Sequence, residues 1–248
     1  MKKLIDWLAT LLFLPIFIIE FIFFDVLQRI ACLFGKDAHE YSARLMHWSF
    51  LNSLRLIGTS FEYKGLDNIP QQGSIILVAN HQSIFDIPLL ANLIYRHKPR
   101  FIAKTALARW IPSASFNLRK AEHAVIKRTD PRQSLREIMS LGEKIDQGLV
   151  SGVIFPEGTR ARDGQLKKFH HAGVAALLKA APNATILPVT LDGTWELSKH
   201  KCMPFPSFVK VKVEVHETKS VSEISSSKEF VSELENKFTK SLKELRAG

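Results

Sequence analysis

The sequence contains very little cysteine and no arrangement of cysteines that suggests a disulfide framework. Its 248 residues include two cysteines, Cys32 and Cys202, and no CxxC pair of the kind that binds metals. This composition is typical of proteins in a reducing compartment, so we expect a cytoplasmic setting. Internal repeats, low-complexity linkers and long charge blocks are also absent from the body of the chain. We therefore predict a single domain with an attached element.

Two further absences limit the chemistry that the chain can perform. The sequence has no Gly-x-Ser-x-Gly motif, so it offers no obvious serine nucleophile for an acyl-enzyme. The histidines His123, His170 and His171 show no recognisable ligand spacing, which disfavours a metal hydrolase, and we predict no metal site. Acidic residues are outnumbered, because 34 Lys+Arg against 24 Asp+Glu give a formal charge of +10. This charge favours anionic partners such as nucleic acids, lipid headgroups or phosphorylated substrates.

The first thirty residues are strongly apolar, which membrane binding requires and nucleic-acid binding does not. The uncharged run 7–19 contains Pro15 and is bounded by Asp6 and Glu20. A spanning helix needs roughly 20 apolar residues, and each central carboxylate costs about 2.5 to 3.5 kcal/mol on insertion scales. Basic residues flank both ends of the run, so the positive-inside rule draws both ends to the cytoplasm. We expect a re-entrant or interfacial helix, with a spanning helix as the alternative.

A second helix is predicted over residues 39–57, where apolar residues recur at helical spacing before the stop signal Gly58. We therefore assign residues 1–58 to N-terminal membrane-associated helices and residues 59–248 to an α/β domain. A cleaved signal peptide is disfavoured because no small-x-small cleavage site is present. The predicted partner of the N-terminal helices is the phospholipid bilayer, and no nucleic-acid partner is expected.

The rest of the chain alternates between strand and helix patterns, which predicts a mixed, largely parallel sheet covered by helices on both faces. Pro188 suggests an edge strand or a bulge at its position. The strict alternation over 209–215 suggests a one-sided antiparallel strand at the margin of the sheet. The predicted strands are 60–64, 75–79, 100–104, 124–126, 152–155, 186–191 and 209–215, and predicted helices include 86–95, 172–181 and one opening at the capping box 226–229.

A histidine and an aspartate follow the buried strand 75–79, at the end where open α/β sheets place their sites. His81 and Asp86 lie about 140° apart on an ideal helix, so only a turn can bring them together. If Asp86 accepts one ring N–H of His81, the other ring nitrogen can remove a proton from a hydroxyl. The alternative is that Asp86 caps the following helix and His81 is a solvated turn residue.

A second motif, Phe155-Pro156-Glu157-Gly158-Thr159-Arg160, also follows a predicted strand. Gly158 would let backbone amides approach an anion closely, and Arg160 could bind a phosphate through two hydrogen bonds. Lys167 and Lys168 continue the basic character of the segment. The alternative is an ordinary Pro-x-Gly surface turn followed by a solvated basic run.

Together these two motifs resemble those of the glycerophospholipid acyltransferase family, most closely bacterial 1-acyl-glycerol-3-phosphate acyltransferases. The resemblance covers roughly residues 65–193. It implies that His81 is the general base and Asp86 its orienting partner, and that the turn from Glu157 to Arg160 helps to bind the acceptor phosphate. Family members also often carry an N-terminal helix pair that docks on one leaflet, which agrees with the re-entrant interpretation.

Two further segments resemble family motifs less closely. Arg128 matches a phosphate-binding arginine, but Lys127 stands where the family usually has an acidic residue, so the acceptor headgroup stays open. Pro188, within a Leu-Pro-Val segment, and Asn80 are assigned to the acyl-donor side. The predicted site is therefore His81 and Asp86 for catalysis, Arg128, Glu157, Gly158, Thr159, Arg160, Lys167 and Lys168 for the substrate phosphate, and Asn80 and Pro188 on the donor side.

The resemblance implies transfer of an acyl group from acyl-CoA or acyl carrier protein to the free hydroxyl of a lysophospholipid. We expect lysophosphatidic acid as the acceptor, no acyl-enzyme, and no cofactor other than the donor co-substrate. Two alternatives are a different lysolipid headgroup, such as lysophosphatidylglycerol or an aminolipid, and a non-catalytic basic membrane-binding protein. The expected location is the cytoplasmic face of the inner membrane, with a monotopic or single-pass anchor.

Overall fold

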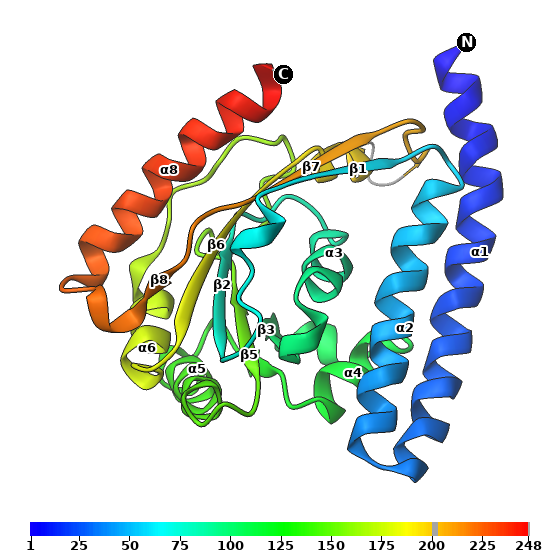
Figure 1. Ribbon diagram of the computed structural model, residues 1–248. Helices are drawn as coiled ribbons and strands as arrows, with labels where there is room; N and C mark the ends of the chain where they lie inside the picture. The colour runs from blue at the N-terminus through cyan, green and yellow to red at the C-terminus, as the bar shows by residue number, and fades with distance from the viewer. Residues whose placement is uncertain (200–202, 248) are drawn as a thin grey trace.

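A computed structural model describes residues 1–199 and 203–247, so Cys202 lies outside the described residues. Figure 1 shows one sheet with helices on both of its faces. The C-terminal helix α8 (Ser227–Ala247) covers one side, and the N-terminal helices α1 (Lys2–Ala31) and α2 (Lys36–Arg55) stand on the other. This arrangement confirms the predicted fold class.

Within the described residues the sheet has eight strands in the order β1-β7-β6-β2-β5-β3-β4, with β8 paired to β6. β6, β2, β5, β3 and β4 run parallel to one another, whereas β7 and β8 are antiparallel to β6 and β1 is parallel to β7. Every predicted strand lies within one residue of an observed one. The strands are β1 (Ser60–Lys64), β2 (Ile75–Ala79), β3 (Pro99–Lys104), β4 (Ala124–Ile126), β5 (Ser151–Ile154), β6 (Thr185–Asp192), β7 (Lys210–Val215) and β8 (Lys219–Ser220).

Pro188 does not lie on an edge strand, because β6 has neighbours on both sides. The backbone oxygen of Pro188 accepts a hydrogen bond from His216 N at 3.0 Å, so its missing N–H faces the side of β7 and β8. These two strands are separated by residues 216–218, and the interruption falls beside Pro188. Of the two predicted alternatives, the edge strand is therefore wrong. The bulge agrees with the structure, because residues 216–218 stand opposite residues 187 and 188 of β6, and this break removes the need for a donor at Pro188.

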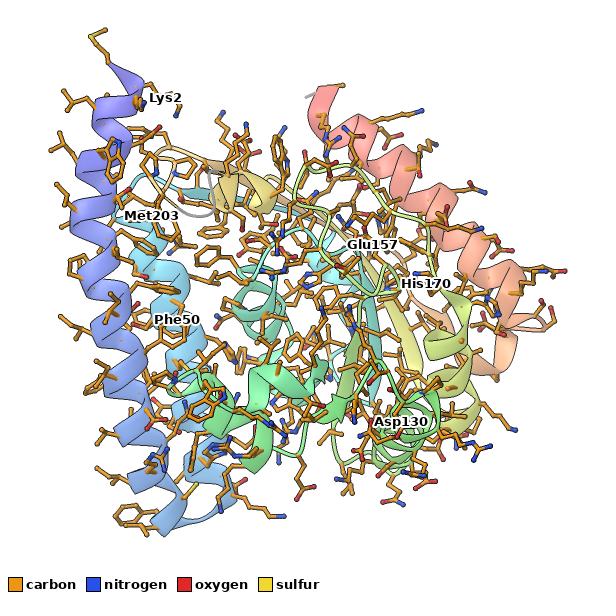
Figure 2. All side chains as sticks on the ribbon, turned by 180° about the vertical axis from the view of Figure 1, so that it is seen from behind. Lys2, Phe50, Asp130, Glu157, His170 and Met203 are labelled. Carbon is orange, nitrogen blue, oxygen red and sulfur yellow. The ribbon has the colours of Figure 1, made fainter. Side chains whose placement is uncertain are left out.

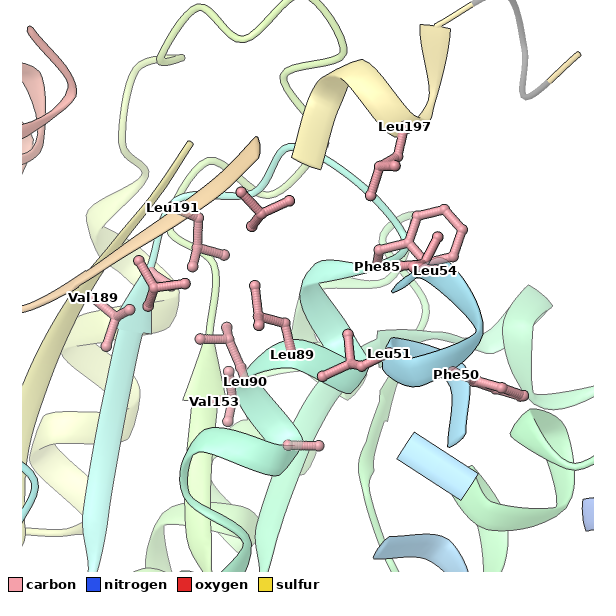
Figure 3. Packing of buried hydrophobic residues seen from close by; sticks show 14 of the residues in the cluster. Phe50, Leu51, Leu54, Phe85, Leu89, Leu90, Val153, Val189, Leu191 and Leu197 are labelled. Atoms are coloured by element: carbon pink, nitrogen blue, oxygen red, sulfur yellow. The ribbon is translucent and has the colours of Figure 1, made fainter. Parts of the chain in front are cut away.

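Alternate residues of β2 serve two separate hydrophobic clusters, which explains why this strand is apolar throughout. Ile75, Leu77 and Ala79 belong to a cluster shared with α1, α2 and α3, part of which is shown in Figure 3. Ile76 and Val78 belong to a cluster shared with α5, α6 and α8. The remaining helices are α3 (Asp86–Leu93), α4 (Ala114–Lys120), α5 (Pro131–Asp146), α6 (His171–Ala180) and α7 (Thr194–Leu197).

The carboxylates that interrupt the apolar N-terminal run all form bonds within the protein. From the sequence alone, these carboxylates are expected to make insertion into a membrane costly, but in the structure each one bonds to a protein partner. Residues 205–207 lie against the first turns of α1, in the region near Lys2 and Met203 in Figure 2. The contacts are Asp6 with Ser207 N at 2.8 Å, Glu20 with the Ser49 hydroxyl, and Asp25 with Arg29 and Ser113 N, both at 2.8 Å.

Helix α1 continues through Pro15 without a break. At 1.5 Å per residue the helix is about 45 Å long. Its outer face exposes large apolar side chains along the whole length, including Leu11, Ile19 and Phe23. Within the part of the chain that the structure describes, 2–34 is the one segment long and apolar enough to cross a membrane. Length alone therefore does not exclude the spanning alternative.

The N-terminal helices share a hydrophobic core with the α/β body. Phe13 and Phe17 of α1 and Phe50 of α2 belong to the same buried cluster as Leu89 of α3. The rings of Phe17 and Phe85 have centroids 5.7 Å apart, which connects α1 with the turn before α3. The helix pair is therefore packed on the body, and the boundary between residues 58 and 59 stays a prediction.

Candidate active site

The turn after β2 is held in place by the amide side chain of Asn80. Its Nδ2 donates to the Leu191 oxygen at 2.8 Å, and its Oδ1 accepts from Leu191 N at 2.7 Å. Both bonds reach the neighbouring strand β6, and Asn80 is buried. The side chain therefore fixes the direction in which the chain leaves the sheet just before His81.

His81 and Asp86 meet in this turn. Nδ1 of His81 lies 2.8 Å from Oδ2 of Asp86, whose side chain is fully buried. The same oxygen accepts backbone hydrogen bonds from Gln82 at 2.6 Å and Ser83 at 2.8 Å, and Thr194 Oγ1 donates to Oδ1 at 2.5 Å. An ionised carboxylate in this position makes Nδ1 a donor and leaves Nε2 able to accept a proton.

Asp86 does not cap the helix that follows it. The N-cap residue of α3 is Phe85, Asp86 is the first helical residue, and no side chain caps this helix. The carboxylate bonds instead to amides that precede the helix. The capping alternative is therefore wrong, and the turn geometry favours orientation of the imidazole.

The imidazole of His81 is also held by contacts with the second motif. Its ring stacks on Phe155 with centroids 4.0 Å apart and an interplanar angle of 17°. The backbone N of His81 donates to Glu157 Oε1 at 2.7 Å, and the backbone oxygen accepts from Ala161 N at 2.7 Å. These contacts bring the two sequence motifs together at the carboxyl ends of the neighbouring strands β2 and β5.

Glu157 is buried and uses both carboxylate oxygens to bind the backbone. Oε1 accepts from His81 N, and Oε2 accepts from Lys167 N at 2.9 Å. Burial raises the pKa of Glu157 to about 7, although the two backbone bonds act in the opposite direction. The carboxylate thus connects two loops and is not part of the cavity lining. Figure 2 labels Glu157 and His170 within the body of the protein.

A cavity of about 510 Å³ opens beside His81 and extends to the N-terminal helices. Phe17 and Phe21 of α1 and Phe50 of α2 contribute to its apolar wall. At the carboxyl ends of the strands its lining is cationic. The cations that line this part are Lys104, Arg128, Arg160 and Arg162.

Lys104 and Arg162 were not among the predicted site residues. Lys104 is the last residue of β3, and its pKa is lowered by burial and by the nearby charges of Arg128, Arg160 and Arg162. Lys104 therefore lies close enough to these three arginines to feel their positive charge. The position of Lys104 at a strand's carboxyl end is a sequence signal that could have identified it.

The remaining predicted residues have different positions. Gly158, at φ +64°, and Thr159 line the cavity, and the Gly158 oxygen accepts from the Arg128 guanidinium. Lys167 donates through Nζ to the Arg160 oxygen at 2.8 Å, so it supports that loop from outside the cavity lining. Lys168 is exposed and does not line the cavity.

Asn80 and Pro188, the two residues assigned to the donor side, do not line the cavity. Both are buried in the sheet region, where Asn80 bonds to β6 and Pro188 pairs with Val78 of β2. Their contacts shape the strand ends that support the site. Among residues 1–199 and 203–247, no group of three or more His, Cys, Asp or Glu side chains is placed to hold a metal ion.

Comparison with known proteins gives a consistent result for this region. The family model described as Acyltransferase matches residues 60–192. The 1-acyl-sn-glycerol-3-phosphate acyltransferase of Borreliella burgdorferi is 31% identical over 175 residues, which cover 70% of this chain and 67% of the relative. The chloroplastic 1-acyl-sn-glycerol-3-phosphate acyltransferase BAT2 of Brassica napus is 30% identical over 165 residues, which cover 66% of this chain.

The chain spans a little under half the length of the first curated relatives, with 45% of the Brassica napus protein and 44% of its Arabidopsis thaliana counterpart covered. A solved structure matches over almost its entire length. The crystal structure of the 1-acyl-sn-glycerophosphate (LPA) acyltransferase PlsC from Thermotoga maritima has a TM-score of 0.84 and 27% identity with this chain. The match covers 100% of this chain and 99% of that one, N-terminal helices included.

The raised pKa of Glu157 predicts a specific pH dependence of stability. Its folded-state pKa of about 7 lies above the ordinary value of 4.5, so the folded protein binds more protons between these values. The stabilisation is complete below pH 4.5 and is lost as the pH rises through 7, with a total of about 3 kcal/mol. We expect Glu157→Gln to remove this loss from the free energy of unfolding, measured in urea at pH 5 and 7.5.

The exposed Glu143 provides a matched control, because Glu143→Gln removes an acidic group from the surface. This control should keep the pH dependence of the wild type. Equal pH dependence in the wild type and Glu157→Gln would show that Glu157 titrates normally.

Proposed function

Because the chain belongs to the acyltransferase family, we propose that it transfers a fatty acyl group from acyl-CoA or acyl carrier protein to the free hydroxyl of a lysophospholipid. The proposed acceptor is 1-acyl-glycerol-3-phosphate, and the product is then phosphatidic acid. One observation carries this proposal: His81, which is bonded to the buried Asp86, lines the same cavity as four cations and a wall of phenylalanine side chains. Such a cavity suits a substrate that combines a hydroxyl, a phosphate and an acyl chain.

In the proposed reaction, Nε2 of His81 accepts the proton of the acceptor hydroxyl. The hydroxyl oxygen forms a bond to the carbonyl carbon of the thioester, and the bond between that carbon and sulfur breaks. The imidazolium then returns its proton to the departing thiolate, so an ester and a free thiol are produced. Asp86 stabilises the imidazolium between these two transfers, and no acyl-enzyme is needed.

The cations of the cavity bind the acceptor phosphate in this proposal. Arg160 and Arg128 come from neighbouring loops, and Lys104 approaches from the end of β3. Guanidinium groups bind phosphate through paired, charge-assisted hydrogen bonds, which would hold the hydroxyl near His81. In this proposal Glu157 does not contact the phosphate, because it does not line the cavity. Its role is to hold the His81 turn and the loop of Lys167 together.

The lysolipid and the product are proposed to exchange with a membrane along α1 and α2. The outer face of α1 is apolar over its length, and the inner face contributes Phe17 and Phe21 to the cavity wall. Basic residues flank both ends of α1, which favours the cytoplasmic side for both ends under the positive-inside rule. Thioester donors would reach the site from that side. We therefore propose the cytoplasmic face of the membrane as the location.

A different acceptor headgroup was the alternative that Lys127 motivated. Lys127 is exposed and does not line the cavity, so its replacement of the usual acidic residue leaves the lining unchanged. Arg128 is retained at the cavity. A phosphate monoester carries up to two negative charges, which suits four cations better than a zwitterionic headgroup does.

A panel of acceptors tests the proposed function directly. Lysophosphatidic acid, lysophosphatidylglycerol and lysophosphatidylethanolamine are each offered with acyl-CoA and with acyl carrier protein. We expect the highest kcat/KM with lysophosphatidic acid, because it presents the greatest charge to the cations. Product formation is followed by free thiol release and by lipid chromatography. Preference for lysophosphatidylglycerol or lysophosphatidylethanolamine, or no transfer to any acceptor, would contradict the proposal.

His81→Ala should lower kcat by about 10² to 10⁴-fold, which is the usual contribution of a general base. Binding to phospholipid vesicles should be retained, because α1 and α2 are unchanged. Thiol release and vesicle sedimentation measure the two properties. The control is His171→Ala, which removes an exposed histidine at the start of α6. Near-normal transfer by His81→Ala would exclude the proposed mechanism.

Arg160→Ala should raise the KM for the acceptor about 10- to 100-fold, because a charge-assisted contact with phosphate is lost. The KM for the thioester donor should change much less. Initial rates with each substrate varied in turn separate the two effects. Arg136→Ala, which removes an exposed arginine of α5, is the control. An unchanged acceptor KM would remove Arg160 from the phosphate site.

A further inference from the structure

The last turn of α8 reaches the carboxyl end of β6 through Arg246. Its guanidinium binds Asp192 with two hydrogen bonds, Nε to Oδ2 at 3.0 Å and Nη2 to Oδ1 at 2.8 Å. Asp192 is the last residue of β6 and is 9% exposed. Figure 1 shows α8 on the opposite side of the sheet from α1. Arg246 is also far from the His81 turn in the sequence. The ion pair therefore joins the C-terminal helix to the centre of the sheet.

Asp192 is in turn connected to the His81 turn by the side chain of Gln82. Gln82 follows His81 directly, is fully buried, and donates through Nε2 to Asp192 Oδ1 at 3.2 Å. The backbone N of Gln82 donates to Asp86. A hydrogen-bonded route thus runs from the guanidinium through Asp192 and Gln82 to the carboxylate that binds the imidazole.

Thr194 strengthens this connection from the same strand end. Its hydroxyl donates to Asp86 Oδ1 at 2.5 Å and lies 3.3 Å from Gln82 Oε1. Gly193, at φ +90°, precedes it, and a Cβ there would lie 2.1 Å from the Lys210 oxygen. The backbone position that presents Thr194 to Asp86 is therefore closely packed and depends on how β6 ends.

Arg246 also binds the loop that carries Arg160. Its Nη2 donates to the Gly164 oxygen at 2.6 Å. Gly164 packs tightly on α7, since a Cβ at this residue would lie 2.7 Å from the Trp195 indole nitrogen. One guanidinium thus contacts both the strand end that supports the His81 turn and the loop of the phosphate-binding segment.

We propose that Arg246 is a positioning residue, which fixes the His81 turn and the Arg160 loop relative to each other. Its charge also compensates that of Asp192, which is connected to the His81 turn through Gln82. The activity readout of this inference rests on the proposed acyl transfer. Its structural readout, the titration of the His81 imidazole, does not.

The expected sign follows from the charges around His81. Removal of Arg246 leaves the Asp192 carboxylate without its ion-pair partner, and a negative charge stabilises the imidazolium. The His81 titration should then move to higher pH, and less of the base should be available at neutral pH. Asp86 and Glu157 bond to His81, while Asp192 and Arg246 are connected to it through Gln82. The other charged or titratable groups lining its cavity are His47, Lys104, His123, Arg128, Arg160, Arg162 and His170.

Arg246→Ala is expected to lower kcat about tenfold and to move the acid limb of the pH–rate profile up by about 0.5 pH unit. Lys243→Ala is the matched control, because it removes an exposed cation from the same helix. Arg246→Lys keeps the charge without the paired hydrogen bonds, so the acid limb should stay at the wild-type pH while kcat is only partly recovered. Asp192→Asn combined with Arg246→Ala removes both charges and should return the acid limb to its wild-type position while kcat stays low.

The His81 titration can be followed by NMR of histidine-labelled protein in detergent, with His81→Gln used to assign the signal. This measurement needs no turnover, so a failure of the proposed reaction would not conceal the result. Circular dichroism and thermal unfolding show which variants are folded, and Arg246→Lys and the double variant replace Arg246→Ala if that variant unfolds. The inference is overturned if Arg246→Ala and Lys243→Ala give the same kcat and the same titration, or if the shift persists in the double variant.

Discussion

The structure of the site depends on the burial of one carboxylate. Asp86 is fully buried, and an ionised group in that position is costly unless its oxygens are bonded. Two turn amides, the Thr194 hydroxyl and the His81 imidazole supply those bonds. The conformation of the turn, the start of α3 and the end of β6 are therefore all constrained by the same carboxylate. This requirement fixes the tautomer and the orientation of the imidazole.

Glu157 is a second buried carboxylate of the site, and its burial is compensated in a different way. Its oxygens bond to two backbone amides, and burial raises its pKa to about 7. Because Asp86 is nearby, a charge on Glu157 is further disfavoured. The loop connection is thus strongest when Glu157 is ionised, whereas burial favours the protonated form. Near neutral pH the contact between the two motifs is balanced between these states.

Sequence reasoning identified the parts of the fold and site that follow from local pattern. The β2 run, His81 and Asp86 lie within twelve consecutive residues, so strand periodicity and spacing were enough to place them. The role of Glu157 and the contribution of Arg246 depend on contacts between residues 76 and 54 positions apart, which no local pattern encodes. The acidic residues of α1 were misleading for the same reason, because their partners lie in distant segments. Domain boundaries and the membrane orientation of α1 stay predictions.

The position of the cavity determines where acceptor selectivity can arise. In the proposed reaction the acyl chain would move from a bilayer to the apolar wall formed by Phe17, Phe21 and Phe50. It would exchange one apolar environment for another, so this step would release little free energy. In the proposed reaction the phosphate would move, by contrast, from a hydrated headgroup layer to the cations of the cavity, where each charge-assisted bond would contribute about 1.5 to 3 kcal/mol. For a lysolipid acceptor, discrimination between headgroups would therefore depend mainly on the cations at the strand ends. This discrimination would assist the reaction only if the loop that carries Arg160 keeps a fixed position relative to His81.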